Sequence, residues 1–228
     1  MIRLVLIETA TACCSVALSE DARIVSCRES EAPRAHAAMT APFIEEMLRE
    51  QGWKVSDCDA VCLSMGPGSY TGLRVGSSTA KGLCFGAGIP LLAVDTPAVL
   101  VAQAQDDGLL PADCRYIVPM VDARRMEVYA AVHTADGARM GDIAPVVVTP
   151  GSFARERAEG PVLFIGDGAA KCAPLFPESV CVQTCPRASA MLRPALHAFR
   201  AGLFRDIAYF EPFYLKQFVA TVSRKALL

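Results

Sequence analysis

The amino-acid sequence predicts an α/β protein made of two similar lobes, each with helices flanking a mixed β-sheet. Hydrophobic residues make up 53% of the 228 residues and charged residues 20%, so the chain can bury a core. The length is large for one small core and short for two full-sized domains. Short apolar runs of strand length alternate with helical stretches, and the order of the first half returns, more loosely, in the second.

In the first half, the predicted order is β-β-β-α-β-α-β-α. Apolar runs bounded by turn residues predict strands over 3–9, 14–20, 22–29, 59–66 and 89–95. Apolar residues at helical spacing predict three helices: one over 34–53, a second that begins near Leu73, and a third over 96–105. Gly52 is expected to cap the first helix, and Thr96 with Pro97 to open the third.

The second half repeats this order with shorter elements. Strands are predicted over 116–124, 126–133, 144–150, 161–168 and 179–184, and helices over 152–158, 169–176 and 188–202, the last with Pro194 inside it. The turn-rich stretch 106–114 is the expected linker. This gives an N-terminal lobe over 1–107, with 201–228 packing back on it, and a smaller lobe over 108–200. By analogy, two such units form the actin-like, ribonuclease H-like architecture of sugar kinases and Hsp70, with ligands in the cleft between lobes.

Composition excludes several classes of protein. The formal net charge of −2 argues against binding nucleic acid through phosphates alone, so RNA contact would need a local patch or a partner. The longest uncharged run, 60–73, is too short to span a membrane, and the N-terminus lacks the pattern of a signal peptide. The ten cysteines form no C-x-x-C pair, which favours reduced, buried thiols and a cytoplasmic protein over a zinc or disulfide framework.

The stretch GPGSYTGLRVGSSTAKGL, from Gly66 to Leu83, is a glycine-rich turn that leads into a helix. Such a turn can bind phosphate through backbone N–H groups, and Arg74 and Lys81 would add positive charge. The spacing is not that of a P-loop. The alternative is that the glycines and small residues permit close packing, and this alternative is favoured.

The first helix is apolar over half of its circumference or more, with Met39, Phe43 and Met47 among its large residues. This width predicts either an adaptable protein-binding surface or deep burial within its own lobe. His36 is followed four residues later by Thr40, so the helix lacks the two histidines that would bind a metal ion. His36 is expected to be a cap or a surface residue.

Two further turns are candidates for a nucleotide cleft. Glu8 and Thr9 follow the first strand, where this architecture usually carries an aspartate and a phosphate-binding turn. Gly166 and Gly168 are small enough for an adenosine to lie close, although a simple strand-to-helix turn is the favoured explanation. The longer Glu8 indicates a weakened or lost nucleotide site. The stretch 121–132 predicts a hairpin with a charged turn, and no catalytic residues or metal ligands are predicted.

The glycine-rich stretch, the sequence VDARRMEVYAA from Val121 and the sequence EPFYLKQ from Glu211 together resemble the TsaB family, also called YeaZ, over essentially the whole chain. The resemblance implies two actin-like lobes, a cytoplasmic location and a role in forming threonylcarbamoyladenosine at position 37 of tRNAs that read codons beginning with A. It implies pairing through the first two helices with TsaD, a related protein that carries out the transfer and has the metal-binding H-x-x-x-H. It also implies assembly with the ATPase TsaE, and homodimers.

The resemblance therefore predicts a non-catalytic subunit that reaches tRNA only through its partners. It predicts no cofactor, with ATP or ADP only at the joint with TsaD. The residues expected at that joint are His36, Met39, Thr40, Phe43, Met47, Tyr70, Arg74, Ser77, Ala80 and Lys81. Phe43→Asp or Ala80→Arg is expected to abolish pairing and leave the fold intact. The family commonly has DTS where this chain has ETA at 8–10, which further weakens a nucleotide site. The alternatives are an independent ATPase, with its nucleotide near Glu8 and Gly166, and a metallopeptidase, which the missing second histidine disfavours.

Overall fold

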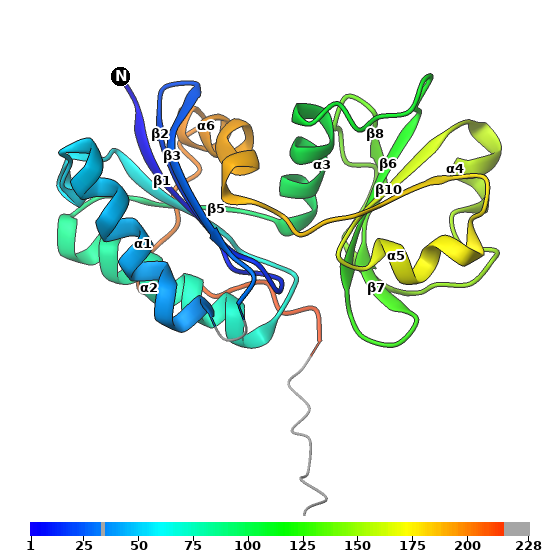
Figure 1. Ribbon diagram of the computed structural model, residues 1–228, viewed down its shortest axis with the longest axis horizontal. Helices are drawn as coiled ribbons and strands as arrows, with labels where there is room; N and C mark the ends of the chain where they lie inside the picture. Colours follow the sequence, from blue (N-terminus) through cyan, green and yellow to red (C-terminus); the bar gives the residue numbers. More distant parts are fainter. Residues whose placement is uncertain (33–34, 217–228) are drawn as a thin grey trace, which may run out of the picture.

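Two mixed β-sheets lie side by side in the computed structural model, which describes residues 1–32 and 35–216, and helices cover both sheets (Figure 1). The predicted fold class, α/β with two mixed sheets flanked by helices, is confirmed. The eight elements of the first half follow one another in the predicted order.

The N-terminal sheet has the strand order β3-β2-β1-β4-β5. Its strands are β1 (Arg3–Glu8), β2 (Cys14–Glu20), β3 (Arg23–Ser30), β4 (Ala60–Ser64) and β5 (Leu91–Val94). β1 pairs antiparallel with β2 and parallel with β4, so Leu6 lies between Ala17 and Cys62. All five of the residues from Leu4 to Glu8 are buried, as expected for a central strand that is covered on both faces.

One face of this sheet is covered by α1 (Ala35–Gln51) and α2 (Tyr70–Ala87), which lie next to each other (Figure 1). The opposite face is covered by the short helix η3 (Ala188–Met191), by α6 (Leu192–Arg200) and by part of α3 (Thr96–Asp106). Gly52 has a φ of 68°, the left-handed conformation expected of the residue that ends α1.

The C-terminal sheet has the strand order β11-β10-β6-β7-β9, with β8 paired to β6. Its strands are β6 (Tyr116–Asp122), β7 (Glu127–Ala130), β8 (His133–Thr134), β9 (Ala144–Val147), β10 (Val162–Gly166) and β11 (Val180–Gln183). Between β9 and β11 lie the helices α4 (Ala154–Glu159), α5 (Ala169–Cys172) and the single turn η2 (Ala173–Leu175). In the other lobe, the single turn η1 (Val55–Asp57) precedes β4. Phe164 and Phe176 stack in the core under these helices, 4.6 Å between ring centroids.

The described C-terminal residues after α6, 203–216, return beneath the N-terminal sheet (orange to red in Figure 1). The Arg205 N–H donates to the Leu91 carbonyl at 2.8 Å, Phe210 joins the core under α1 and α2, and the Phe213 N–H donates to the Met65 carbonyl at 2.7 Å. We call residues 203–216 the strap. The remaining residues of the predicted C-terminal segment, 217–228, lie outside the described part of the chain.

Several predicted boundaries were wrong. α2 begins at Tyr70 and not near Leu73, because Ser69 already caps it: its hydroxyl accepts a hydrogen bond from the Gly72 N–H at 3.3 Å. Asp95, not Thr96, caps α3. The helix predicted over 188–202 divides into η3 and α6, which places Pro194 in a first turn, where its missing N–H costs nothing.

The cysteines behave as small apolar residues. All ten are free thiols, and six of them are buried. Burial raises the pKa of the Cys84 thiol to about 11 and of the Cys13 thiol to about 12, so these groups stay protonated. Among the described residues, no helix has both the length and the apolar character needed to cross a bilayer.

Candidate functional site

The inner sides of α1 and α2 form the core of the N-terminal lobe. Phe43, Met47 and Ala80 pack with the apolar side chains of β1, β2 and β4, and Phe43, the most exposed of the three, is only 9% exposed. The apolar width of α1 is therefore explained largely by its own sheet, which was the alternative prediction for this helix.

This burial corrects the predicted partner surface. Half of the residues expected at the joint are buried within the lobe: Thr40, Phe43, Met47, Ser77 and Ala80. Phe43→Asp or Ala80→Arg would place a charge in the core of the lobe. Neither variant would therefore leave the fold intact, contrary to the expectation from sequence. Periodicity identifies the residues that share one side of a helix, but not whether that side faces the sheet or the solvent.

The outer sides of the same two helices carry small exposed residues along α2 and in the first half of α1, whereas the second half of α1 exposes Glu45, Glu46, Arg49 and Glu50. The exposed small residues are Ala37, Ala38, Ala41 and Pro42 on α1 and Thr71, Ser78, Gly82 and Gly86 on α2. On α2, Ser78, Gly82 and Gly86 recur four positions apart and Thr71 lies seven positions before Ser78, which puts them in one stripe along the helix. Phe85 continues that stripe and is 85% exposed. We call this set of residues the outer helical face. Sequence analysis missed Phe85 as a contact residue, although its spacing from Ser78 and Gly82 was visible.

The other residues predicted at the joint lie around this face. Arg74 is exposed and lies over the Tyr70 ring, 4.4 Å from its centroid. Lys81 donates to the Ala208 carbonyl of the strap at 3.5 Å. Met39 is half-buried against the lobe core. The α2 side of the outer helical face therefore borders the strap.

His36 and Thr40 are engaged in local hydrogen bonds. The His36 Nε2 atom is 2.9 Å from the Thr11 carbonyl oxygen. The Thr40 hydroxyl donates to the His36 carbonyl at 2.6 Å and contacts the Cys14 Sγ atom at 3.3 Å. Within the described ranges, no group of three His, Cys, Asp or Glu side chains is arranged to hold a metal ion.

The glycines of the Gly66–Leu83 stretch make room for the turn after β1. A Cβ atom on Gly68 would collide with the Ala10 carbonyl, one on Gly72 with the Thr9 carbonyl, and one on Gly76 with the Thr9 hydroxyl. The Ser69 N–H donates to the Ala10 carbonyl at 2.6 Å. The start of α2 is thus occupied by the chain itself, and the glycines are explained by close packing between two backbone segments.

Glu8 lies beneath this turn and is completely buried. Its Oε1 atom accepts the Ala10 N–H at 2.7 Å, while Oε2 has no hydrogen-bond partner among the described residues. Burial raises the pKa of Glu8 to about 7, and the nearby charge of Asp167 in the other lobe adds to the rise. Burial also raises the pKa of Asp167 to about 6. Each lobe therefore has a carboxyl group with a raised pKa, and the charge of Asp167 contributes to the rise at Glu8.

The two other cleft glycines also pack against the chain. A Cβ on Gly166 would collide with the Met120 carbonyl, and one on Gly168 would lie 2.9 Å from Val128 Cγ1 and 3.0 Å from the Met120 carbonyl oxygen. The Asp167 Oδ1 atom accepts the Asp122 N–H at 2.8 Å. The small residues at this turn therefore let β10 and α5 approach β6 and β7.

The structure confirms the predicted hairpin with a charged turn. β6 and β7 pair antiparallel, with Val121 opposite Tyr129, and Arg124 and Arg125 lie exposed in the turn. Lys171 forms an ion pair with Asp122 and donates to the Glu127 carbonyl at 2.7 Å.

Comparison with known proteins identifies relatives of this chain. Residues 29–197 match the model of the family described as TsaD, tRNA N6-adenosine threonylcarbamoyltransferase. The chain is 32% identical to the tRNA threonylcarbamoyladenosine biosynthesis protein TsaB of Escherichia coli, over 96% of both chains.

Among solved structures, the fold is similar to that of a Pseudomonas aeruginosa protein described as similar to peptidase YeaZ. The TM-score is 0.84 and the identity 26%, over 95% of this chain and 100% of that one. The activator of 2-hydroxyisocaproyl-CoA dehydratase from Clostridium difficile, solved with bound ADPNP, has a TM-score of 0.50 at 9% identity, over 89% of this chain and 96% of that one. The latter similarity concerns the fold alone, and it supports the actin-like architecture.

Proposed function

Because this chain belongs to the TsaB (YeaZ) family, on the TsaB side of the wider family named for TsaD, we propose that it is a non-catalytic subunit in the formation of threonylcarbamoyladenosine at position 37 of tRNA. Its partner in this proposal is a TsaD-type protein in the cytoplasm, which a TsaE-type ATPase joins. The chain alone forms a homodimer through the surface that the partner later covers.

The observation that carries the proposal is the outer helical face. The first half of α1 and the neighbouring α2 expose small side chains, so the backbone of another helix pair can approach closely there. Phe85 projects from this surface at 85% exposure, and an aromatic side chain of this kind is a typical anchor of an interface. A folded monomer gains nothing from exposing Phe85, whereas a partner that buries it removes its ring from water.

The proposed effect on catalysis is a shift of population. A four-helix contact of ordinary size buries on the order of 1,600 Å² in total. If the TsaD-type partner binds this chain only in its active conformation, pairing raises the fraction of that conformation. No catalytic group of this chain is needed for such an effect. Any ATP or ADP is proposed to bind at the joint, because the turn after β1 already fills the start of α2.

The proposal is tested by changing the exposed rather than the buried residues of these helices. We expect Phe85→Asp and Ser78→Arg to weaken pairing with the TsaD-type partner by about 100-fold, since a charge at the centre of an interface typically costs more than 2 kcal/mol. The measurement is size-exclusion chromatography with light scattering on mixtures of the two purified proteins.

Two matched controls accompany these variants. Met140→Asp and Ala158→Arg change exposed residues of the C-terminal lobe in the same chemical sense and should leave pairing unchanged. All four variants should keep the wild-type unfolding temperature within a few degrees, because their side chains lie on the surface. Normal heterodimer yield with both Phe85→Asp and Ser78→Arg would remove the outer helical face from the proposal.

A further inference from the structure

The β6–β7 hairpin carries two arginines in an unfavourable backbone conformation. Arg124 and Arg125 have φ values of 69° and 50°, in the left-handed region that glycine and asparagine adopt more readily. Each such residue costs roughly 1 kcal/mol relative to an ordinary turn. A turn built for stability alone would have asparagine and glycine at these positions, so the arginine side chains themselves require an explanation.

Neither side chain has a partner within the described part of the chain. Arg124 and Arg125 are exposed, and no carboxylate lies within ion-pair distance of them. The nearest acidic groups are already neutralised, because Asp122 pairs with Lys171 and Glu127 pairs with Lys216. The local charge at the hairpin tip is therefore positive, on a chain with a formal net charge of −2.

The strap connects this tip to the start of α2. Tyr214 contacts Tyr70 with 5.1 Å between ring centroids, and the guanidinium of Arg74 lies 4.4 Å from the centroid of the Tyr70 ring. Two residues further on, the ammonium group of Lys216 lies 5.9 Å from the centroid of the Tyr129 ring on β7. Cations and aromatic rings thus lie next to one another from one lobe to the other. We call these residues the arginine–tyrosine track: Tyr70, Arg74, Tyr129, Arg124, Arg125, Tyr214 and Lys216.

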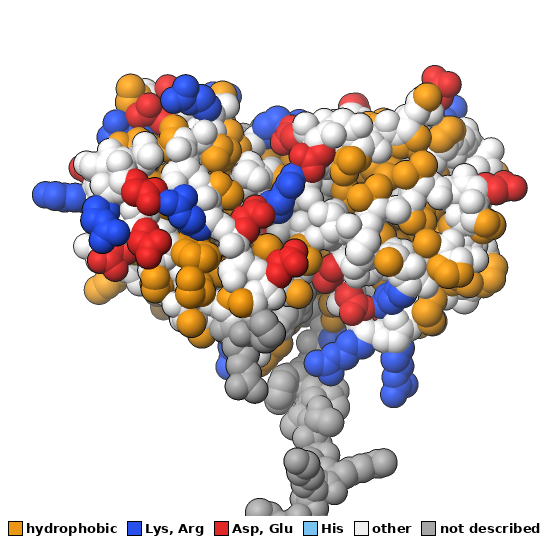
Figure 2. Space-filling view, viewed as in Figure 1, with side chains coloured by type: hydrophobic (Ala, Val, Ile, Leu, Met, Phe, Trp, Pro, Cys, Tyr) orange, Lys and Arg blue, Asp and Glu red, His pale blue; other side chains and the backbone are white. Residues whose placement is uncertain are grey.

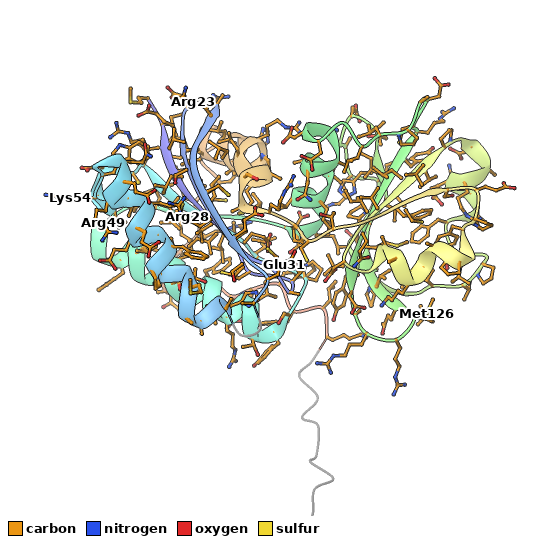
Figure 3. All side chains as sticks on the ribbon, viewed as in Figure 1. Arg23, Arg28, Glu31, Arg49, Lys54 and Met126 are labelled. Atoms are coloured by element: carbon orange, nitrogen blue, oxygen red, sulfur yellow. The ribbon has the colours of Figure 1, made fainter. Side chains whose placement is uncertain are left out.

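The figures place the hairpin end of this track on the surface. Lys and Arg side chains project below the C-terminal lobe (Figure 2), in the region where Met126 marks the hairpin (Figure 3). Tyr214 is 37% exposed, so part of its ring is open to a ligand. Arg23 and Arg49 lie on the outer side of the other lobe, away from Met126 (Figure 3).

We propose that this chain contacts the tRNA itself, with the arginine–tyrosine track binding a stretch of RNA backbone and its exposed bases. The inference rests on the proposed function, which supplies RNA as the substrate of the assembly. Arg124 and Arg125 bind phosphate groups, for which a planar guanidinium is well suited. The partly exposed Tyr70 and Tyr214 offer surfaces on which unpaired bases stack, whereas the buried Tyr129 only holds Lys216 in place. Since Arg74 also borders the outer helical face, the RNA runs along the edge of the subunit joint.

RNA fits the track better than an acidic protein surface does. Two adjacent guanidinium groups would bind the phosphates of RNA or the carboxylates of an acidic protein equally well. Cations beside partly exposed aromatic rings are the arrangement expected for single-stranded nucleic acid, where the cations follow the backbone and the rings meet the bases. An acidic protein surface would need the cations, and Tyr214 would then contribute only contact area to the interface.

The test measures binding of a fluorescent anticodon stem–loop RNA by anisotropy, with the chain alone and with its TsaD-type complex. We expect the double variant Arg124→Ala/Arg125→Ala to bind the RNA about tenfold more weakly than the wild type. It should also reduce the slope of log K against log salt concentration by about 1.4 to 1.8, because each of the two lost phosphate contacts removes roughly 0.7 to 0.9 from that slope. Arg124→Lys/Arg125→Lys should retain most of the binding and Tyr214→Ala should weaken it without changing the salt slope. Arg23→Ala/Arg49→Ala, which removes the same charge from exposed arginines of the other lobe, should bind as the wild type does.

Unchanged RNA affinity in Arg124→Ala/Arg125→Ala would overturn the proposal. An equal loss in the Arg23→Ala/Arg49→Ala control would also overturn it, because binding would then follow net charge alone. Polyglutamate that competed as well as the RNA would assign the arginines to an acidic protein. Light scattering separates this inference from the proposed function, because Arg124→Ala/Arg125→Ala should still form the heterodimer at the wild-type yield.

Discussion

Glu8 is a completely buried carboxyl group, and its protonation is linked to stability. Its pKa is about 7 in the folded chain and near 4.5 when exposed to water, so folding favours the protonated form. The stabilising contribution is fully present below about pH 4.5 and is lost as the pH rises through 7. At 1.36 kcal/mol per pKa unit, deprotonation costs the folded state about 3 kcal/mol above pH 7.

This linkage predicts that Glu8→Gln stabilises the protein at pH 8, by up to about 3 kcal/mol, and that the gain largely disappears at pH 4.5. The amide keeps an acceptor for the Ala10 N–H and needs no proton to stay neutral. Urea unfolding at the two pH values measures the difference, with Glu178→Gln, an exposed carboxylate of the C-terminal lobe, as the control. Equal stability of Glu8→Gln and the wild type at pH 8 would mean that Glu8 is not the buried acid described here.

At the scale of elements, local signals predict the order of helices and strands. Apolar runs of strand length, a glycine after the last turn of α1 and a cap before α3 each report a short segment, and each lies close to its expected place. The candidate contact residues were less predictable, because which side of α1 and α2 meets the sheet depends on tertiary packing. Phe43 and Phe85 look alike in the sequence, and only the sheet separates the buried ring from the exposed one.

The glycines of α2 give a prediction with an internal control. A glycine in a helix interior normally costs roughly 1 kcal/mol relative to alanine. Gly82 has open space around it, so Gly82→Ala should stabilise the protein by about 0.5 to 1 kcal/mol. At Gly72 the same change would push a methyl group into the Thr9 carbonyl, so Gly72→Ala should destabilise by about 2 kcal/mol or more. Thermal unfolding of both variants tests the packing argument, and a gain in stability for Gly72→Ala would contradict it.

At the scale of the whole molecule, α3 belongs to both lobes. Val99 packs with β1, β4 and α6 beneath the N-terminal sheet, whereas Leu100, Val101 and Ala104 pack on β6 and β10 of the C-terminal sheet. Gln103 donates to the Thr184 hydroxyl at 2.9 Å, and Gln105 to the Ala135 carbonyl at 2.8 Å. The sequence placed this helix at the end of the first lobe. That it also covers the second sheet could not be predicted from local patterns, because both sides of α3 are apolar.

A helix shared in this way should make the two lobes unfold together. Trp53, the single tryptophan, packs against the N-terminal core and reports the unfolding of that lobe, while far-UV circular dichroism reports the unfolding of both lobes.

Leu100 is completely buried against the other sheet, so Leu100→Ala should lower the free energy of unfolding by about 2 to 5 kcal/mol. If the two lobes unfold cooperatively, Leu100→Ala lowers the urea midpoint seen by Trp53 fluorescence by as much as the midpoint seen by circular dichroism. Val147→Ala, at an exposed position of β9, should leave both transitions in place. A Trp53 transition that stayed at its wild-type midpoint while the dichroism separated into two steps would show that α3 does not couple the unfolding of the two lobes.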